Sequence, residues 1–413
     1  MVTAASRPDR ERLLGALKTG LHSSWRAGFA RKPRLTLAAV CAAAERRVGH
    51  GAFGPDPHWR PPLELLLADL RHHARLNALG RTIAYGQLVG ILAQRAHAYA
   101  LWAERPEILR QPLAPPIIVL GQMRSGSTRV QRLLACDDRF AHTRFFESWQ
   151  PIPRGRPGVD DRKLRAGAAL AAARLINPRF DAIHPTALSA PDEEIGFHAF
   201  SLCGAPFEAQ WRVPAFTAFW ESQPMDAVYA EFRQLLQTVA WARGETGARP
   251  WILKVPQFMQ DLPALLRAFP GARLLCLDRD PAEIVASSAS LALNQMQIQS
   301  DVVDPHWIGR EWLRKVALRE HIARTTRAAA PQVPQLDIAF TAMNQDWQAE
   351  MRRVYAFLDM ELPAAILRRM DSYVEGARGH ADRRPAYSLA QFGLTRLDVA
   401  RALSAQPAPL AAE

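Results

Sequence analysis

Apolar residues recur three and four positions apart through the first quarter of the chain, which is the spacing of one face of an α-helix. The positions that carry this pattern are Leu63, Leu66, Leu67, Leu70, Leu88, Ile91, Leu92 and Ala96. The sequence therefore predicts helices over residues 9–110. Gly51–Pro62 (GAFGPDPHWRPP) interrupts the pattern, and its glycines and prolines predict a connector between helices.

Short apolar runs of another kind follow, and each precedes a stretch of helical periodicity. The runs are Ile117–Leu120, Trp251–Val255, Arg273–Asp278 and Gln335–Phe340. Strands that alternate with helices favour a parallel sheet covered by helices on both faces, so the predicted fold class is α/β. The prolines of Gln111–Pro116 (QPLAPP) end the helical pattern. We expect an N-terminal helical region over residues 1–112 and an α/β domain over residues 113–413.

The segment after the first predicted strand has the composition of a phosphate-binding loop. It reads GQMRSGST over Gly121–Thr128, where Gly121 and Gly126 allow a tight turn that points backbone N–H groups at an anion. The helix that begins near Ser127 adds free N–H groups and the positive end of its dipole. The spacing is that of a Walker A loop, but Ser127 stands where that motif has its lysine. This difference argues against γ-phosphate chemistry. The plain alternative is a Gly/Ser turn between a strand and a helix.

A second candidate phosphate site follows the strand predicted over Arg273–Asp278. Arg279 comes at the carboxyl end of this strand, where open α/β sheets bind ligands. Asp280 and Pro281 have the pattern of a helix start, which places Ser287 two turns into the helix. A guanidinium fork and a nearby hydroxyl suit a phosphate. The alternative is an ordinary strand-to-helix turn with Arg279 in a local salt bridge.

Composition narrows the possible functions. The formal charge is +12, yet the basic residues are distributed along the whole chain, which argues against a nucleic-acid-binding module. The four cysteines are scattered without CxxC spacing, so they predict neither a metal site nor a disulfide framework. There is no run of about 18 apolar residues and no signal-peptide pattern at the start. We expect a cytoplasmic protein without a transmembrane segment.

Together, the loop and the second site resemble the motifs of sulfotransferases that use 3′-phosphoadenosine 5′-phosphosulfate (PAPS). The chain is most similar to a bacterial group that also resembles tyrosylprotein sulfotransferases, whose loop reads P-R-S-G-[ST]-[ST]; Met123 replaces the proline. The resemblance implies a P-loop-like three-layer fold, PAPS as co-substrate, adenosine 3′,5′-bisphosphate as product, and no metal. The residues that it assigns to the donor are Arg124, Ser125, Gly126, Ser127 and Thr128 in the loop, Arg279 and Ser287 at the 3′-phosphate, and Arg378 and Gly379 in a C-terminal tail, Gly376–Leu394.

The same resemblance suggests how sulfonate transfer is catalysed. Trp251–Leu266 (WILKVPQFMQDLPALL) is similar to the family segment W-[VI]-L-K-x-P-x-H, with Phe258 where a histidine is frequent. Lys254, one of only five lysines, ends a predicted strand. With Arg124 it is expected to stabilise negative charge on the transferring group and the leaving phosphate.

Two residues are candidates for the general base that takes the proton of the acceptor. Glu147, in the segment HTRFFESWQPIP, matches the position of the base in tyrosylprotein-type sulfotransferases. Its apolar neighbours predict partial desolvation and a raised pKa. The alternative for Glu147 is a structural pair with an arginine such as Arg144. His142 is the competing base, because a neutral imidazole can accept a proton at pH 7. His184, His198, His306 and His380 show weaker patterns.

The expected acceptor pocket lies in Ile183–Phe200 and the aromatic stretch Phe207–Trp220, although buried core is the default interpretation of these aromatics. Asp192, Glu193 and Glu194 resemble the family's P-x-E segment, and helix capping is their alternative. The predicted function is transfer of a sulfonate from PAPS to a hydroxyl or amine of a small-molecule, lipid or natural-product acceptor. The alternatives are a P-loop nucleotide kinase and a non-catalytic relative that only binds the nucleotide.

Overall fold

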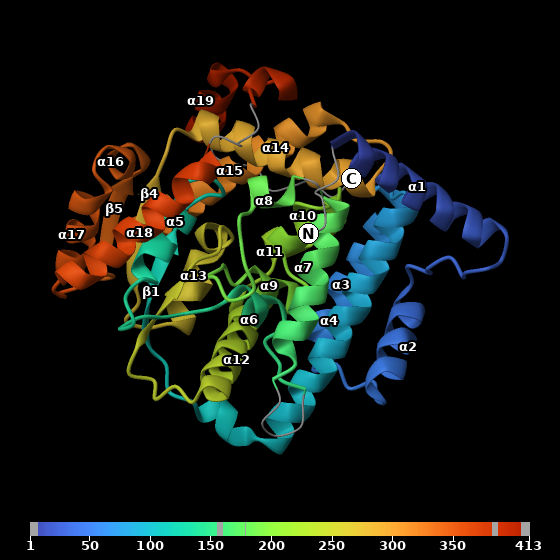
Figure 1. Cartoon of the computed structure of the whole chain (residues 1–413), viewed down its shortest axis with the longest axis horizontal. Coiled ribbons are helices and arrows are strands. Elements are labelled where there is room, and N and C mark those ends of the chain that lie inside the picture. The colour runs from blue at the N-terminus through green and yellow to red at the C-terminus, as the bar shows by residue number, and fades with distance from the viewer. Residues whose placement is uncertain (1–6, 155–159, 178, 382–386, 406–413) are drawn as a thin grey trace.

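A five-stranded parallel sheet lies between layers of helices in the computed structural model (Figure 1). The structure describes residues 7–154, 160–177, 179–381 and 387–405. Its strands are β1 (Ala114–Leu120), β2 (Ala141–His142), β3 (Pro250–Leu253), β4 (Arg273–Asp278) and β5 (Gln335–Ala339). They are ordered β2-β3-β1-β4-β5, and every neighbouring pair is parallel. The predicted α/β fold is confirmed, and so are the four predicted strands. The sequence missed β2, because two residues are too few to show a period.

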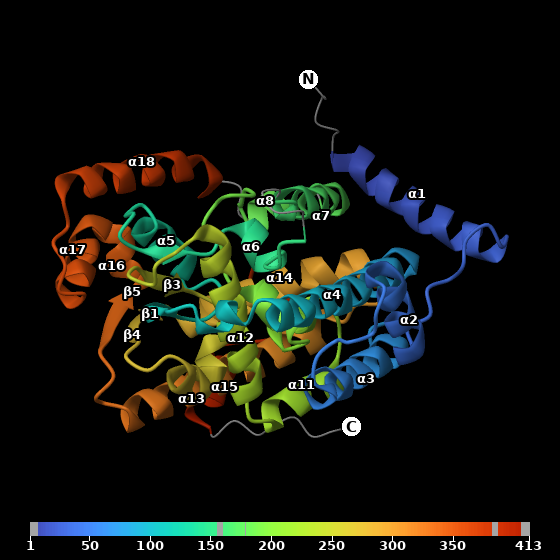
Figure 2. The same ribbon diagram turned by 90° about the horizontal axis from the view of Figure 1, so that it is seen from below.

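The side chains of β1 alternate between two hydrophobic cores, since successive residues of a strand point to opposite faces. Ile117 and Val119 pack in the core formed with α5 (Ser127–Leu134), α17 (Trp347–Phe357) and α18 (Ala364–Ala381). Ile118 and Leu120 pack in the core formed with α12 (Asp226–Arg243) and α13 (Phe258–Ala268). Figure 2 shows α5 and α18 on one side of the sheet and α13 on the other. The central strand is therefore buried on both faces, which holds the loop after it firmly in place.

The N-terminal region is helical, as predicted. Its elements are α1 (Arg7–Arg26), α2 (Leu37–Val48), α3 (Asp56–His72), α4 (Ala78–Glu104) and the 3₁₀ turn η1 (Pro106–Arg110). Leu63 of α3 and Leu92 of α4 belong to the same core as Ile118 and Leu253 of the sheet. The hydrophobic core thus runs across residue 112 without interruption.

The predicted connector, Gly51–Pro62, is shorter than expected, because α3 already begins at Asp56. Proline is tolerated in the first turn of a helix, where N–H groups have no intrahelical partner, so Pro57 does not delay the start. The indole N–H of Trp59 donates to Gly54 O at 3.2 Å, and its ring is buried. This contact ties the helix start to the preceding turn and helps to keep Pro61 and Pro62 helical.

A long run of short helices connects β2 to β3, and further helices follow β4. The first group is α6 (Phe145–Trp149), α7 (Arg162–Ile176), α8 (Phe180–Ile183), α9 (Ile195–Phe200), α10 (Ala205–Glu208), α11 (Pro214–Ser222) and α12. The second is α14 (Pro281–Gln299), α15 (Pro305–Ala329), α16 (Phe340–Gln345), η2 (Leu389–Phe392) and α19 (Arg396–Ser404), besides β5, α17 and α18. Within the described residues, no helix is both long and apolar enough to cross a membrane.

Candidate active site

The loop after β1 has the geometry of a phosphate cradle. Gly126 has φ +92°, and a Cβ there would lie 2.9 Å from the ring of Phe340. A Cβ on Gly121 would lie 2.6 Å from Ser125 Oγ. Gly126 therefore requires glycine, whereas a side chain at Gly121 would displace the Ser125 hydroxyl. The loop opens onto the N-terminus of α5, whose first N–H groups have no intrahelical acceptor. The Ser125 hydroxyl is fully buried and has no hydrogen-bond partner among the described residues, so an anion in the cradle would supply one.

The loop is anchored to the helix behind it by Gln122, which is buried. Its Nε2 donates to Val316 O and to Glu320 Oε1 of α15, both at 3.1 Å. Sequence reasoning gave Gln122 no role, because its partners lie almost 200 residues away. The anchor limits how far the loop can shift when a ligand binds.

The two predicted phosphate sites are in direct contact. Arg124 Nε donates to Ser287 Oγ at 3.1 Å, and Arg279 Nη1 donates to Arg124 O at 2.6 Å. The Arg279 guanidinium stacks 4.3 Å from the centre of the Phe340 ring and also pairs with Glu283. Asp280 caps α14 as predicted, by accepting from Ala282 N at 2.9 Å. The structure thus gathers Arg124, Arg279 and Ser287 at the carboxyl end of the sheet.

Replacing Arg279 with alanine is expected to weaken binding of adenosine 3′,5′-bisphosphate by about 10- to 100-fold. The reason is the loss of charge-assisted hydrogen bonds, each worth roughly 1.5–3 kcal/mol, to the 3′-phosphate. Adenosine 5′-monophosphate should lose no more than about threefold, through the weaker support of Arg124 O. Calorimetric titration measures the change in affinity for each nucleotide. Glu283→Gln, which removes the carboxylate paired with Arg279 and keeps the guanidinium, is the control. Equal losses for both nucleotides would place the 3′-phosphate elsewhere.

An acidic segment that precedes α9 faces the same edge of the sheet. Lys254 directly follows β3, whose last residue pairs with Ile118 of β1. The buried Lys254 ammonium lies 2.7 Å from Glu193 Oε2. Asp192 lies 3.0 Å from His184 Nε2. Lys254 therefore sits at the carboxyl edge of the sheet, at the end of the strand that neighbours β1.

The helix of the phosphate loop holds this acidic segment in place. Gln131 Nε2 of α5 donates to Asp192 O at 3.0 Å. Arg132 donates to Pro191 O at 3.3 Å and to Pro185 O at 2.7 Å. Both ends of the segment from Pro185 to Asp192 are thus attached to α5. His184, Asp192 and Glu193 also have ligand atoms within 4.8 Å of one another, the spacing of a metal site. Each of the three is already engaged, by the His184–Asp192 hydrogen bond or by Lys254.

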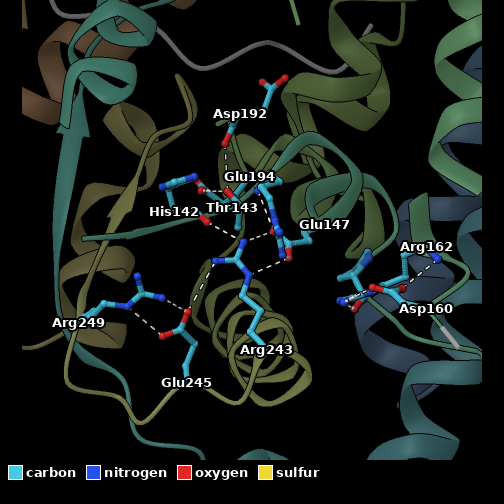
Figure 3. Close-up of polar contacts among 12 residues, drawn as sticks. His142, Thr143, Glu147, Asp160, Arg162, Asp192, Glu194, Arg243, Glu245 and Arg249 are labelled. Carbon is cyan, nitrogen blue, oxygen red and sulfur yellow. Dashed lines mark hydrogen bonds and ion pairs between the residues drawn. The ribbon is translucent and has the colours of Figure 1, made fainter. Parts of the chain in front are cut away.

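Glu194 is buried between the ends of β2 and β3 (Figure 3). Its carboxyl accepts from Lys254 N at 2.8 Å and makes a short contact with Thr143 Oγ1, which also lies 3.0 Å from Asp192 O. Burial raises the pKa of Glu194 to about 8. A threonine hydroxyl has one proton, so a protonated Glu194 can donate to Thr143 while Thr143 donates to Asp192. Glu194 is a structural acid that joins the strand ends to the acidic segment.

An open pocket lies beside Arg124 and Ser287. Ile183 and Tyr387 line it together with one face of α14, at Ser290, Leu291 and Asn294, and with Arg179. Of the segment Ile183–Phe200, only Ile183 lines this pocket. The aromatic residues of Phe207–Trp220 are mostly buried core: Phe207, Trp211, Phe216 and Trp220.

Glu147, the expected base, is held in an ion-pair cluster (Figure 3). Its carboxylate lies 2.5 Å from Arg144 Nη2 and 2.8 Å from Arg243 Nε, and it accepts from Arg144 N at 2.9 Å. Burial alone would raise the pKa of Glu147, but the hydrogen bonds and charges of Arg243 and Arg144 outweigh it and lower the pKa to about 2. These contacts correspond to the structural alternative for Glu147, and they disfavour proton abstraction.

His142, the competing base, belongs to the same cluster as Glu147. It lies in β2, and its carbonyl oxygen accepts from Arg243 Nη2 at 2.8 Å. Burial lowers the pKa of His142 to about 4, and the Arg243 charge adds to this effect. The imidazole is neutral at pH 7, as a base requires. The charges that act on it are those of Arg243, Glu147, Arg144 and Arg249.

Arg378 and Gly379, the expected contacts of the 3′-phosphate in the tail, fall in the last turn of α18. The start of the predicted tail is therefore helical, and the surroundings of these two residues lie outside the described part of the chain. Farther on, Phe392 is buried against α15, where a Cβ on Gly309 would lie 2.6 Å from Phe392 O. This close approach fixes the segment that carries Tyr387.

The fold is a P-loop-like α/β sandwich, and comparison with known proteins specifies its family. The model of the sulfotransferase family matches residues 115–364, more than half of the chain. This chain belongs to the sulfotransferase family. No curated protein sequence matches it.

Two solved structures of mycobacterial enzymes share the fold. Sulfotransferase STF1 from Mycobacterium tuberculosis H37Rv superposes with a TM-score of 0.78 at 24% identity, covering 91% of this chain and 100% of that one. Sulfotransferase STF9 from Mycobacterium avium superposes with a TM-score of 0.75 at 23% identity, covering 90% and 95% of the two chains. The likeness extends into the N-terminal helices as well as the sheet, because no more than a tenth of this chain is unmatched.

Proposed function

We propose that this protein transfers a sulfonate group from PAPS to a hydroxyl or amine of a small-molecule, lipid or natural-product acceptor. The observation that carries the proposal is the contact between the two phosphate sites, in which Arg124 of the loop meets Ser287 and Arg279. Two phosphate sites side by side suit a nucleotide with both a 5′ and a 3′ phosphate. Family membership supports sulfonate transfer in general.

The donor fits the residues present. The free N–H groups at the start of α5, with Ser127, Thr128 and the unpartnered hydroxyl of Ser125, suit the 5′-phosphosulfate. Arg279 and Ser287 suit the 3′-phosphate. The hydrogen bond from Arg124 to Ser287 is then exchanged for bonds to the nucleotide. No lysine occupies the Walker position, so a terminal γ-phosphate lacks its usual cation.

Charge stabilisation in this reaction falls to Arg124 and Lys254. As the acceptor oxygen attacks sulfur in line, negative charge builds on the leaving 5′-phosphate, and fixed cations in a site with little water stabilise it. Lys254 is buried and already faces this edge of the sheet. A sulfonate carries less charge than a phosphoryl group, so we propose that transfer proceeds without a metal. We place the reaction in the cytoplasm, where the four free cysteines stay reduced.

We propose that the acceptor binds in the pocket between α14 and Ile183. This pocket begins at Arg124 and Ser287, so a molecule within it approaches the donor from the side of α14. Its lining mixes hydroxyl, amide and guanidinium groups with Leu291 and Tyr387. Such a lining suits a partly polar acceptor.

The proposed function is tested by thermal unfolding with added nucleotides. Adenosine 3′,5′-bisphosphate without magnesium should raise the melting temperature, and by more than ATP with magnesium does, because a ligand that binds only the native state stabilises it. At a hundred times its dissociation constant the gain is about 2.7 kcal/mol. Equal or better stabilisation by ATP would favour a P-loop kinase. Binding of the bisphosphate without release of sulfonate from PAPS would identify a non-catalytic relative.

A further inference from the structure

His184 and Asp192 form a hydrogen-bonded pair beside the phosphate loop. His184 Nε2 lies 3.1 and 3.0 Å from the two carboxylate oxygens of Asp192. Asp192 also accepts from the Thr186 hydroxyl at 2.5 Å and from Glu193 N at 2.8 Å, and it is buried. A carboxylate held by this many donors has one orientation, and it fixes the orientation of the imidazole that faces it.

The pair leaves one nitrogen of His184 available. Because Nε2 faces a carboxylate, it carries the proton of the neutral ring, and Nδ1 is then an acceptor. The described residues provide no hydrogen-bond partner for Nδ1. The ring is only partly buried and packs edge-on against Phe180, with 6.2 Å between the ring centres. His184 is thus oriented, and its Nδ1 is free to bind a substrate hydroxyl.

Three contacts fix this pair relative to the donor site. Arg124 Nη1 donates to Ile183 O at 3.2 Å, directly before His184 in the chain. Arg132 of α5 holds Pro185 O, directly after it, and Gln131 holds Asp192 O. The phosphate loop and its helix therefore hold the residues directly before and after His184 by hydrogen bonds. Ile183 also lines the pocket that begins at Arg124.

The charges that face His184 come from its own segment and from the end of β3. They are the carboxylates of Asp192 and Glu193 and the ammonium of Lys254. Burial alone would lower the pKa of His184, but the charge and hydrogen bond of Asp192, with a smaller effect of Glu193, raise it above its usual value despite Lys254. The imidazole is therefore a stronger proton acceptor than a free histidine.

We propose that His184, oriented by Asp192, is the general base that takes the proton of the acceptor hydroxyl. This inference rests on the proposed function. The acceptor oxygen forms a bond to sulfur while the bond from sulfur to the bridging oxygen of PAPS breaks. The electron pair of that bond stays on the 5′-phosphate of adenosine 3′,5′-bisphosphate. The hydroxyl proton moves to His184 Nδ1, and Asp192 stabilises the imidazolium until the proton leaves to solvent.

The other carboxylates at this edge are less suited to the task. Glu193 is paired with the Lys254 ammonium at 2.7 Å, so its carboxylate already has a partner. Glu194 is buried, and both of its oxygens contact Thr143 or Lys254. Glu147 is held by two arginines. Among these groups only His184 combines a free acceptor atom, an orienting partner and a tether to the phosphate loop.

The pH dependence of transfer tests this assignment. The variants are His184→Gln, Asp192→Asn and Glu193→Gln, with His58→Gln as control, because His58 is exposed on α3. We would measure kcat/KM for transfer from PAPS to 2-naphthol between pH 5 and 9. Release of bisphosphate with water as acceptor would be followed in parallel. The wild-type rate should rise with pH as His184 loses its proton and then level off. His184→Gln should lower the plateau by about 10²- to 10⁴-fold and remove the rise.

The pH profile of Asp192→Asn distinguishes catalysis by His184 from a purely structural role of the pair, because a structural role would not shift the profile. Loss of the carboxylate removes the charge that raises the His184 pKa, so the rise in rate should shift to lower pH while the plateau falls. This shift decides the question even when His184→Gln folds poorly. An unmoved rise in Asp192→Asn, or a plateau within threefold of wild type in folded His184→Gln, would overturn the proposal. Loss of the rise in Glu193→Gln alone would assign the base to Glu193. Stabilisation by the bisphosphate, measured on each variant, separates these outcomes from failure of the proposed function.

Discussion

Glu147→Gln is expected to lower the free energy of unfolding by about 2–4 kcal/mol. The substitution leaves the charges of Arg243 and Arg144 beside a neutral amide in a buried site, and removing one partner of a buried ion pair costs roughly 3–5 kcal/mol. We take a lower figure because Arg144 is 30% exposed and Arg243 14% exposed, so water screens part of the lost attraction. Sulfonate transfer per folded molecule should stay within a few-fold of wild type. Urea denaturation and an activity assay on the soluble fraction measure the two effects.

The pH dependence of stability gives the same prediction a second test. The pKa of Glu147 is lowered to about 2 in the folded protein. A depressed carboxyl pKa contributes stability that is present above the unfolded value of roughly 4.5 and is lost as the pH falls through about 2. The Glu147→Gln variant should lack this contribution to stability, so its free energy of unfolding should fall less at low pH than that of wild type. Transfer abolished in well-folded Glu147→Gln would instead restore Glu147 as the base.

Glu194→Gln is the matched control, since both glutamates are fully buried. The pKa of Glu194 is raised to about 8, so its carboxyl is mostly protonated at pH 7 and an amide replaces it closely. A raised carboxyl pKa makes wild-type stability fall as the pH rises from about 4.5 through about 8, and the variant should lose that slope. We expect its free energy of unfolding at pH 7 to stay within about 1 kcal/mol of wild type.

Arg95→Met is expected to cost about 3–5 kcal/mol of stability, the second large effect. Arg95 of α4 is fully buried and forms a two-pronged pair with Glu231 of α12, at 2.9 and 2.7 Å. It also donates to Phe53 O at 2.9 Å and to Phe200 O at 3.1 Å. Removing the guanidinium leaves a buried carboxylate whose charge no cation offsets. Chemical denaturation measures the loss.

Two further variants show that the loss comes from this buried pair. Arg105→Met, at the C-terminal end of the same helix, removes an arginine whose side chain is 53% exposed and should cost less than about 1 kcal/mol. Adding Glu231→Gln to Arg95→Met should recover stability, because the neutral amide can accept from one of the Tyr99 and Ser201 hydroxyls and donate to the other. Equal costs for Arg95→Met and Arg105→Met would show that the pair contributes little.

The sequence predicted the parts of the site that are formed by neighbours in the chain. A strand, two glycines and a helix lie within one short segment, so the phosphate loop was recognisable before any tertiary contact was known. The turn at Arg279 and Asp280 was also predicted correctly, because a helix cap is a local pattern. Each strand carries its own apolar run, which is why four of the five were found.

The residues that sequence reasoning misjudged owe their roles to distant partners. Glu147 was given a raised pKa from its apolar neighbours, but Arg243, 96 positions away, reverses the shift. The pairing of His184 with Asp192 was not predicted, because nothing in the intervening turn shows that Asp192 folds back onto it. The anchor of the phosphate loop on Gln122 could not be predicted either, because its partners lie far away in the chain. Periodicity shows which face of an element is buried, but not which element covers it.

The core that runs across residue 112 has a consequence for how the chain can be divided. Leu63 and Leu92 share one hydrophobic cluster with Ile118 and Leu253. A fragment that begins at residue 113 would expose the surfaces of α9, α11 and α14 against which α3 and α4 pack, and Glu231 would lose its cation. The boundary expected at residue 112 therefore does not separate two cores, and we expect the N-terminal helices and the α/β domain to unfold together.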